Sequence, residues 1–185
     1  DISGLLNYET AIITGNAAKD TLKGGAGKDT ITGGAGVDTM TGGAGADIFV
    51  FGVSDSVAGT SLDVITDFNT GGSDVIKLAA AGTVLAADAA ALVAGSGVGS
   101  NVNTTAGGLV IFAAADNTYA LKVAAIQADS ELDAIASVAI FQDGGNTYFY
   151  SAGAANGNAD DQIIQLTGVA LTTITGTSTT DFTIA

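Results

Sequence analysis

The chain has 185 residues, with 19 acidic and five basic side chains, which gives a formal net charge of −14. This charge disfavours nucleic acid and anionic membrane surfaces as partners. The sequence contains no Cys, His, Pro, Trp or Arg, so disulfides, thiolate metal sites, the HExxH zinc site, a Ser-His-Asp triad and an arginine clamp on phosphate are excluded. No apolar run reaches the roughly 18 residues of a membrane-spanning helix, and we expect no membrane span.

The acidic residues are strongly biased towards aspartate, with 17 Asp and only two Glu, Glu9 and Glu131. The short Asp side chain keeps its carboxylate close to the backbone, which suits turns and helix caps. It also suits loops that bind cations. Composition alone therefore leaves two interpretations open, a loop-rich acidic surface and a set of calcium sites.

The N-terminal segment 5–15 has the pattern of a strand, and its apolar pair Ile12 and Ile13 favours a strand that leads into the following residues. The chain begins with Asp1 and not with an initiator Met. We therefore expect it to be a processed product or part of a longer protein.

Four nine-residue repeats follow, at 15–23, 24–32, 33–41 and 42–50. An aspartate recurs at the sixth position and a large apolar residue two positions later, giving the pairs Asp20 and Leu22, Asp29 and Ile31, Asp38 and Met40, Asp47 and Phe49. The last three copies match G-G-x-G-x-D-x-U-x in full, where U is a large apolar residue, whereas the first carries Asn16 and Ala18 in place of two glycines. A flexible glycine-rich linker would not keep these positions in phase.

Each repeat position has a physical role. Glycine permits the positive φ angles of a tight loop and lets carbonyl oxygens converge, while aspartate supplies a carboxylate to a cation such as Ca²⁺, which takes about six to eight oxygen ligands. The x-U-x triplet is a short strand, so the large apolar residues should point inward. The outward positions are polar except for Ile48 and Val50 in the fourth repeat, which predicts that this repeat is covered. A phosphate loop at Gly27-Lys28 is excluded, because Asp29 stands where Ser or Thr is needed.

The repeats resemble those of RTX (repeats-in-toxin) proteins, a calcium-binding β-roll family exported by type I secretion. The resemblance implies a mainly all-β fold, with a parallel β-roll of two repeats per turn and equivalent loops eighteen residues apart. It pairs Asp20 with Asp38 and Asp29 with Asp47, each pair sharing a Ca²⁺ ion. The remaining ligands implied are backbone carbonyls of the loops, at Gly24, Ala26, Gly27, Gly33, Ala35, Gly36, Gly42, Ala44 and Gly45.

Residues 52–78 are interpreted as the cap of the roll. From Asp47 onward the chain resembles the segment after the repeats in serralysin-type proteases, through the motifs at 47–51, 63–68 and 74–78. This resemblance implies that Asp63, Asp67 and Asp74 complete the end calcium sites, with Asp63 and Asp67 the stronger candidates. The alternative is that these residues only begin turns. Asp55 is interpreted as a turn residue.

Residues 79–185 are expected to form a β-rich C-terminal region with one or two short helices. In chain order we predict a helix over 84–94, a loop over 95–108, strands over 109–113 and 120–126, a short helix over 129–137, a hairpin over 138–150 and a strand over 160–169. Tyr148 and Tyr150 alternate with Phe149, which favours one core face over a sugar-binding platform. The end, 175–185, resembles a type I secretion signal, so the predicted divisions are a roll at 1–51, a cap at 52–78 and this region at 79–185.

The sequence thus favours a calcium-dependent extracellular structural protein of surface-layer, fibre or matrix type. Its richness in small residues and lack of Cys resemble RTX surface-layer proteins. We expect it to fold on Ca²⁺ after export by the type I machinery, outside the cell or at a bacterial cell surface, and to form a homo-oligomer or polymer. The alternative is a C-terminal calcium-folding and secretion module of a larger secreted enzyme, toxin or adhesin. No enzymatic activity is expected, because the repeated aspartates are better explained as ligands than as acid catalysts.

Overall fold

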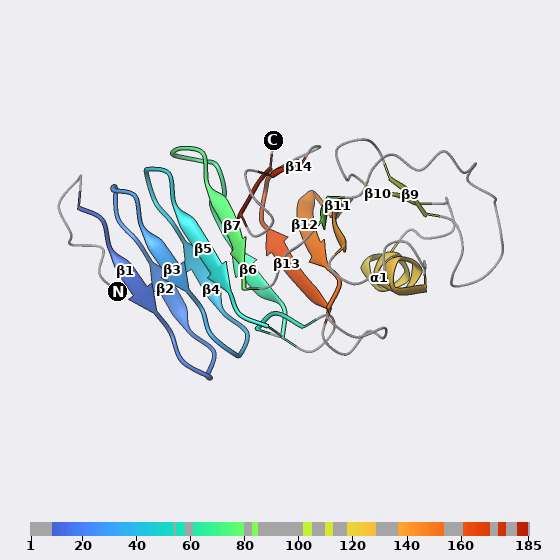
Figure 1. The fold of residues 1–185 in the computed structure, drawn as a ribbon, viewed down its shortest axis with the longest axis horizontal. Coiled ribbons are helices and arrows are strands. Elements are labelled where there is room, and N and C mark those ends of the chain that lie inside the picture. Colours follow the sequence, from blue (N-terminus) through green and yellow to red (C-terminus); the bar gives the residue numbers. More distant parts are fainter. Residues whose placement is uncertain are drawn as a thin grey trace.

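Consecutive repeats fold into strands that alternate between two facing parallel sheets (Figure 1). The computed structural model describes residues 9–53, 55–57, 61–79, 83–84, 102–104, 110–112, 118–128, 137–153, 161–170, 174–176 and 181–184. One sheet takes β1 (Ile12–Thr14), β3 (Thr30–Thr32), β5 (Ile48–Phe51) and β7 (Val75–Leu78). The other takes β2 (Thr21–Lys23), β4 (Thr39–Thr41) and β6 (Asp63–Ile65). The predicted parallel β-roll is confirmed, and we call β1 to β7 the roll.

Every strand of the roll contributes at least one apolar residue to its core. The register stacks Ile31 on Phe49 and Phe49 on Ile76 in one sheet, and Met40 on Ile65 in the other, and all five side chains are fully buried. These residues follow an aspartate by two positions, so alternation along a short strand turns them inward. Leu22 and Ile13, at the N-terminal end, are partly buried against the same core.

The outward positions of the fourth repeat are only partly covered. Ile48 and Val50 are half-buried, as Thr30 and Thr32 are in the preceding strand of the sheet. The next strand, β7, pairs with β5 edge to edge and so extends the sheet sideways. The predicted cover over this repeat is therefore incomplete.

Both sheets of the roll continue into the C-terminal region without a break (Figure 1). Next to β6 lies β13 (Gln162–Leu166), followed by β12 (Asn146–Ser151), β11 (Ser137–Asp143) and the two-residue β8 (Thr83–Val84). Next to β7 lies β15 (Asp181–Ile184), followed by β14 (Ile174–Gly176). β13 runs parallel to β6, whereas β15 is antiparallel to β7. The strands predicted at 160–169 and in the 138–150 hairpin are confirmed.

A second core lies on the outer face of β11, β12 and β13. The helix α1 (Tyr119–Ala128) packs there, with Ile126 against Phe141, Tyr150 and Ile163. Phe149 points to the opposite face and into the core of the roll, so β12 is buried on both faces and not on the one face predicted. Gly144 and Gly145, with φ of 55° and 81°, form the two-residue turn of the hairpin.

The prediction of a strand over 120–126 is wrong, because these residues belong to α1. Tyr119, Val123 and Ile126 recur at helical spacing and face the second core, and the Thr118 hydroxyl accepts the N–H of Leu121 at 3.3 Å. The Val, Ile and Ala residues of this segment are compatible with a strand or a helix locally. Burial of one helical face against the second core therefore determines that the segment is a helix.

The other predictions for the C-terminal region have mixed outcomes. The strand at 109–113 is confirmed as β10 (Val110–Phe112), but the predicted loop at 95–108 contains its partner, β9 (Val102–Thr104). Val84 lies in β8 and not in a helix, and the rest of the helix predicted over 84–94 lies outside the described residues. Ser137 begins β11, and residues 129–136 of the second predicted helix also lie outside them. In the described stretches, no helix has the length and apolar character needed to cross a membrane.

Candidate metal centre

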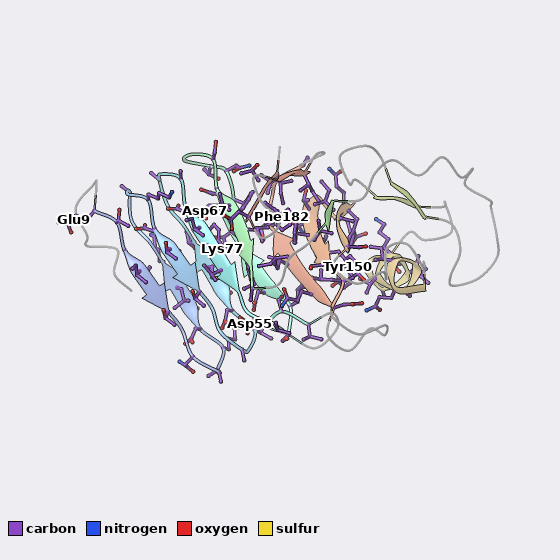
Figure 2. All side chains as sticks on the ribbon, in the orientation of Figure 1. Glu9, Asp55, Asp67, Lys77, Tyr150 and Phe182 are labelled. Atoms are coloured by element: carbon purple, nitrogen blue, oxygen red, sulfur yellow. The ribbon has the colours of Figure 1, made fainter. Side chains whose placement is uncertain are left out.

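The loops between the strands are stacked in two rows at opposite edges of the roll. One row contains the loops at 24–28, 42–46 and 67–73, which precede β3, β5 and β7. The other contains the loops at 15–19 and 33–37 and the segment that leads to β6. Asp67 and Asp55 lie at these opposite edges (Figure 2). Within a row the loops touch through their backbones, as where Ala44 donates its N–H to the carbonyl of Gly25 at 3.0 Å.

The first row carries a continuous ladder of aspartates, which we call the first ladder. Asp29 Oδ1 accepts the N–H of Ala11 at 2.7 Å, Asp47 Oδ1 accepts that of Asp29 at 2.8 Å, and Asp74 Oδ1 accepts that of Asp47 at 2.9 Å. All three carboxylates are buried. Asp47 and Asp74 therefore each hold the backbone of the aspartate in the preceding turn, and Asp29 holds that of Ala11.

The second row carries the second ladder, with the same geometry. Asp38 Oδ1 accepts the N–H of Asp20, and Asp63 Oδ1 accepts the N–H of Asp38, both at 2.8 Å. Asp38 and Asp63 are fully buried. The structure thus brings Asp20 next to Asp38 and Asp29 next to Asp47, the two pairs that the RTX resemblance implies.

Three of the ladder aspartates have a second carboxylate oxygen that the described part of the roll leaves without a hydrogen bond. Asp38 Oδ2, Asp47 Oδ2 and Asp63 Oδ2 are buried and have no hydrogen-bond partner among the described residues. A buried carboxylate oxygen without a partner is costly, and a cation removes that cost. Carboxylate oxygens are also the hard ligands that Ca²⁺ prefers, so these residues fit a calcium ion.

Backbone carbonyls crowd the same places. A side chain at Gly24 would collide with Asp29 Oδ2 and with the carbonyl oxygen of Gly42, and one at Gly42 would collide with Asp47 Oδ2. The first glycine of a repeat therefore lies between its own aspartate and a carbonyl of the next turn. Among the described residues no three acidic side chains form a cluster suited to a metal ion. An ion held here would take its remaining ligands from the backbone.

The other predicted carbonyl donors are placed in the same loops. Gly33 abuts Asp38 Oδ2, and the carbonyls of Gly27 and Gly45 lie against the next loop of their row, at Gly45 and Gly72. Gly36 and Gly45 have φ of 126° and 127°, which disfavours any residue with a side chain. The remaining predicted donors are the central residues of the three loops, Ala26, Ala35 and Ala44.

Asp67, Asp20 and Asp29 differ from Asp38, Asp47 and Asp63 in the predicted set. Asp29 Oδ2 accepts the N–H of Gly25 at 2.6 Å, in addition to the bond that Oδ1 accepts from Ala11. Asp67 accepts the N–H groups of Gly42 and Gly43 with its two oxygens, at 2.9 and 2.8 Å, and therefore caps the neighbouring loop. Asp20 accepts the N–H of Asn16 at 2.8 Å, and the Asn16 amide contacts its other oxygen at 3.4 Å. All three carboxylates thus have protein donors already.

Asp74 is the residue to which sequence reasoning gave less weight as a calcium ligand than to Asp63 and Asp67. It occupies the last step of the first ladder, equivalent to Asp63 in the second. The signal was present in the sequence, because Asp74 precedes the buried Ile76 by two positions, as Asp47 precedes Phe49. Asp63 stands in the same relation to Ile65.

Burial raises the pKa of four ladder carboxylates, those of Asp38, Asp47, Asp63 and Asp74, above their usual value. The pKa of Asp63 rises to about 7 and that of Asp47 to about 6, chiefly because the charged forms lose hydration, with neighbouring carboxylates adding to the shift. The pKa values of Asp38 and Asp74 are raised by the same cause. A bound divalent cation would reverse this effect by favouring the ionised carboxylates.

Comparison with known protein families agrees with this geometry. Residues 14–49 match the sequence profile of the RTX calcium-binding nonapeptide repeat, in four copies. A search of curated protein sequences gave no match to the chain. The repeats are therefore RTX repeats of the calcium-binding type, and the resemblance inferred from them is confirmed over this segment.

Proposed function

We propose that this protein is a calcium-dependent extracellular structural protein that folds when Ca²⁺ enters its repeat loops. The observation that carries the proposal is the set of buried carboxylate oxygens on Asp38, Asp47 and Asp63 that have no hydrogen-bond partner in the described part of the chain. They lie in stacked loops in which carbonyl oxygens of the next turn are close by. A Ca²⁺ ion would give these negatively charged oxygens a positively charged partner.

Electrostatics supports folding that depends on calcium. The chain has only five Lys against 19 acidic residues, so repulsion between stacked carboxylates opposes the roll when no cation is present. Calcium binding would remove this repulsion and tie together loops that are eighteen residues apart, so its binding energy becomes folding energy. Sites with Kd of roughly 10⁻⁴–10⁻³ M would leave the chain unfolded inside a cell and fold it outside.

The proposed structural role and self-assembly rest on the edges of the roll. β1 pairs only with β3 and β2 only with β4 among the described strands, and Ile12 is 82 % exposed. Edge strands with free backbone groups are suited to pairing with another chain. Proteins with RTX repeats are typically secreted, and export by a type I system would place this chain where millimolar calcium is present. We propose no enzymatic activity for it.

The alternative is a C-terminal module that folds on calcium within a larger secreted enzyme, toxin or adhesin. The continuity of both sheets from the roll into β13 and β15 favours it, because the roll and the C-terminal region would then fold as one unit. Such a unit needs no contact with a second copy.

Sedimentation velocity of the chain during a calcium titration tests both proposals, with Mg²⁺ as the control cation. A slow, expanded monomer that converts into large species supports the assembling structural protein. Compaction without association supports the module. An unchanged sedimentation coefficient up to 10 mM Ca²⁺, a chosen upper limit above the weak extracellular range, would contradict calcium-driven folding. A chain with both Asp38→Asn and Asp47→Asn should lose the response.

A further inference from the structure

The two aspartate ladders end on residues that also bind the C-terminal region. At the end of the second ladder, the N–H of Asp63 donates to Ser56 Oγ at 2.8 Å. The Ser56 hydroxyl in turn donates to the carbonyl oxygen of Ile163 at 2.7 Å. Ser56 is fully buried, and the N–H of Ile163 returns a bond to its carbonyl at 2.9 Å. The ladder thus passes directly into β13.

The first ladder ends in a similar way at Asn69. Asn69 Oδ1 accepts the N–H of Asp74 at 2.8 Å, and its own N–H donates to Asp74 Oδ2 at 2.7 Å. Its side-chain amide Nδ2 donates to the carbonyl oxygen of Ile184 at 2.5 Å. The ladder thus passes into β15, more than a hundred residues further along the chain.

Asn69 is held in a conformation that commits it to these contacts. Its φ of 61° is the only positive value of a non-glycine residue among the described residues. Asparagine tolerates this region better than most residues because its short side chain bonds to nearby backbone. Here the Oδ1 of that side chain bonds to the ladder at Asp74, and its Nδ2 bonds to the C-terminal strand β15 at Ile184.

We propose that Ser56 and Asn69 couple the calcium-dependent order of the roll to the docking of the C-terminal region. The inference rests on the proposed calcium-driven folding. Fixing Asp63 and Asp74 orients the hydroxyl of Ser56 and the amide of Asn69, which then present their donors to β13 and β15. β13 and β15 dock on β6 and β7, the last strands of the roll, so the C-terminal region has no template until the roll has formed.

The chain contains reporters that separate the two regions. Of its four tyrosines, Tyr119, Tyr148 and Tyr150 lie in the C-terminal region and their rings belong to the second core, and the chain has no Trp. Near-UV circular dichroism of tyrosine therefore follows that core. Amide exchange of peptides from 28–51 follows the roll, and exchange of peptides from 137–166 follows the C-terminal sheet.

The experiment is a calcium titration of the full chain with these readouts, comparing the double variant Ser56→Ala, Asn69→Gly with the unsubstituted chain. Glycine keeps the positive φ at position 69 while removing the side chain. The control double variant is Thr41→Ala, Thr66→Ala. It removes two hydroxyls that bond to each other within the roll at 2.7 Å, and Thr66 Oγ1 also donates to the carbonyl of Met40.

In the unsubstituted chain, both regions should gain protection at the same calcium midpoint. In the coupling variant, residues 28–51 should still become protected. Exchange protection of residues 137–166 at saturating calcium should fall by about tenfold or more and the tyrosine signal should weaken, because the side-chain hydrogen bonds to Ile163 and Ile184 are lost. The control variant should keep the two regions coincident.

Two results would overturn the coupling. One is a coupling variant whose two regions remain coincident and as protected as those of the control. The other is loss of protection at 28–51 even at saturating calcium, because Ser56 and Asn69 would then stabilise the roll itself. If the proposed calcium-driven folding is wrong, the result is different, because the unsubstituted chain would then show no response to calcium in either region.

Discussion

Asp47 donates its backbone N–H to Asp74 Oδ1 across 27 residues of chain, at 2.9 Å. The corresponding step between Asp29 and Asp47 spans 18 residues. The ladder therefore keeps its geometry although the repeat period has been lost. The segment after the last perfect repeat acts as one more turn of the roll.

We expect the substitution Asp74→Asn to weaken calcium binding by tenfold or more, because a charge-assisted contact contributes about 1.5–3 kcal/mol. The amide would also set an Nδ2 donor against the N–H of Asn69, which now donates to Asp74 Oδ2. Isothermal titration calorimetry with Ca²⁺ measures the change. Asp143→Asn is the matched control, since it removes the same charge from the hairpin, where Asp143 pairs with Lys122 at 2.8 Å. Equal effects of both substitutions would count against a role of Asp74 at the ion.

The metal-free chain should be more stable at acidic pH than at neutral pH. The pKa of Asp47 is about 6 and that of Asp63 about 7 in the folded state, above the usual 3.8, so the folded state binds protons more tightly than the unfolded state. This stabilisation is complete below about pH 4 and is lost as pH rises through about 6 to 7. Far-UV circular dichroism in the presence of a chelator should therefore show β-structure at about pH 4 that is lost as pH rises through this range.

With calcium present the dependence should reverse, because protons and Ca²⁺ compete for the same carboxylates. The calcium concentration needed for folding should fall as pH rises from about 5 to 7.5. A midpoint in calcium that does not change with pH would show that Asp47 and Asp63 stay out of the binding event.

The substitution Gly42→Ala should disrupt the loop stack, because the new methyl group would meet Asp47 Oδ2 and its carboxylate carbon. We expect the calcium midpoint to rise by tenfold or more and the calcium-loaded roll to lose about 2 kcal/mol of unfolding free energy. Gly145→Ala is the control. It lies in the hairpin turn with open space around it, and only its φ of 81° opposes a side chain. The control should leave the calcium midpoint unchanged, and a shift as large as that of Gly42→Ala would contradict the proposed site.

Phe182→Ala should destabilise the calcium-loaded protein by about 3–5 kcal/mol, the usual range for a buried phenylalanine. Phe182 is 1 % exposed and its ring lies 5.6 Å from that of Phe149, between the roll and the C-terminal strands (Figure 2). Thermal unfolding in saturating calcium measures the loss, and Thr183→Ala on the half-buried face of the same strand is the comparison. Similar melting temperatures for the two variants would show that β15 contributes little to the fold.

The sequence was most informative where structure is local and repeated. An aspartate followed two positions later by a large apolar residue was enough to predict the strands at 21–23, 30–32 and 39–41 and the buried side chains of Ile31 and Met40. The nine-residue period repeats one pattern four times, and this repetition identifies the structure more specifically than a single nine-residue motif could.

The C-terminal region was harder to predict, because its structure depends on distant partners. Residues 120–126 contain Val, Leu and Ile and looked like a strand, but their helical face is selected by Phe141 and Tyr150. The segment predicted as a secretion signal contains β15, whose pairing with β7 joins positions more than a hundred residues apart. Ser56 and Asn69 show no motif, and only the tertiary structure reveals where their bonds go.

The alternation of repeats between the two sheets imposes a parity rule on changes in the length of the roll. Each repeat sends the chain to the opposite sheet, so one inserted nonapeptide after β4 would exchange the sheets to which β6 and β7 belong. β13 and β15 would then meet the wrong edges, and the contacts of Ser56 and Asn69 with Ile163 and Ile184 would be lost together. An inserted pair of repeats restores the original arrangement one turn further along. The roll can therefore lengthen or shorten in steps of eighteen residues, while steps of nine are forbidden by the region that closes it.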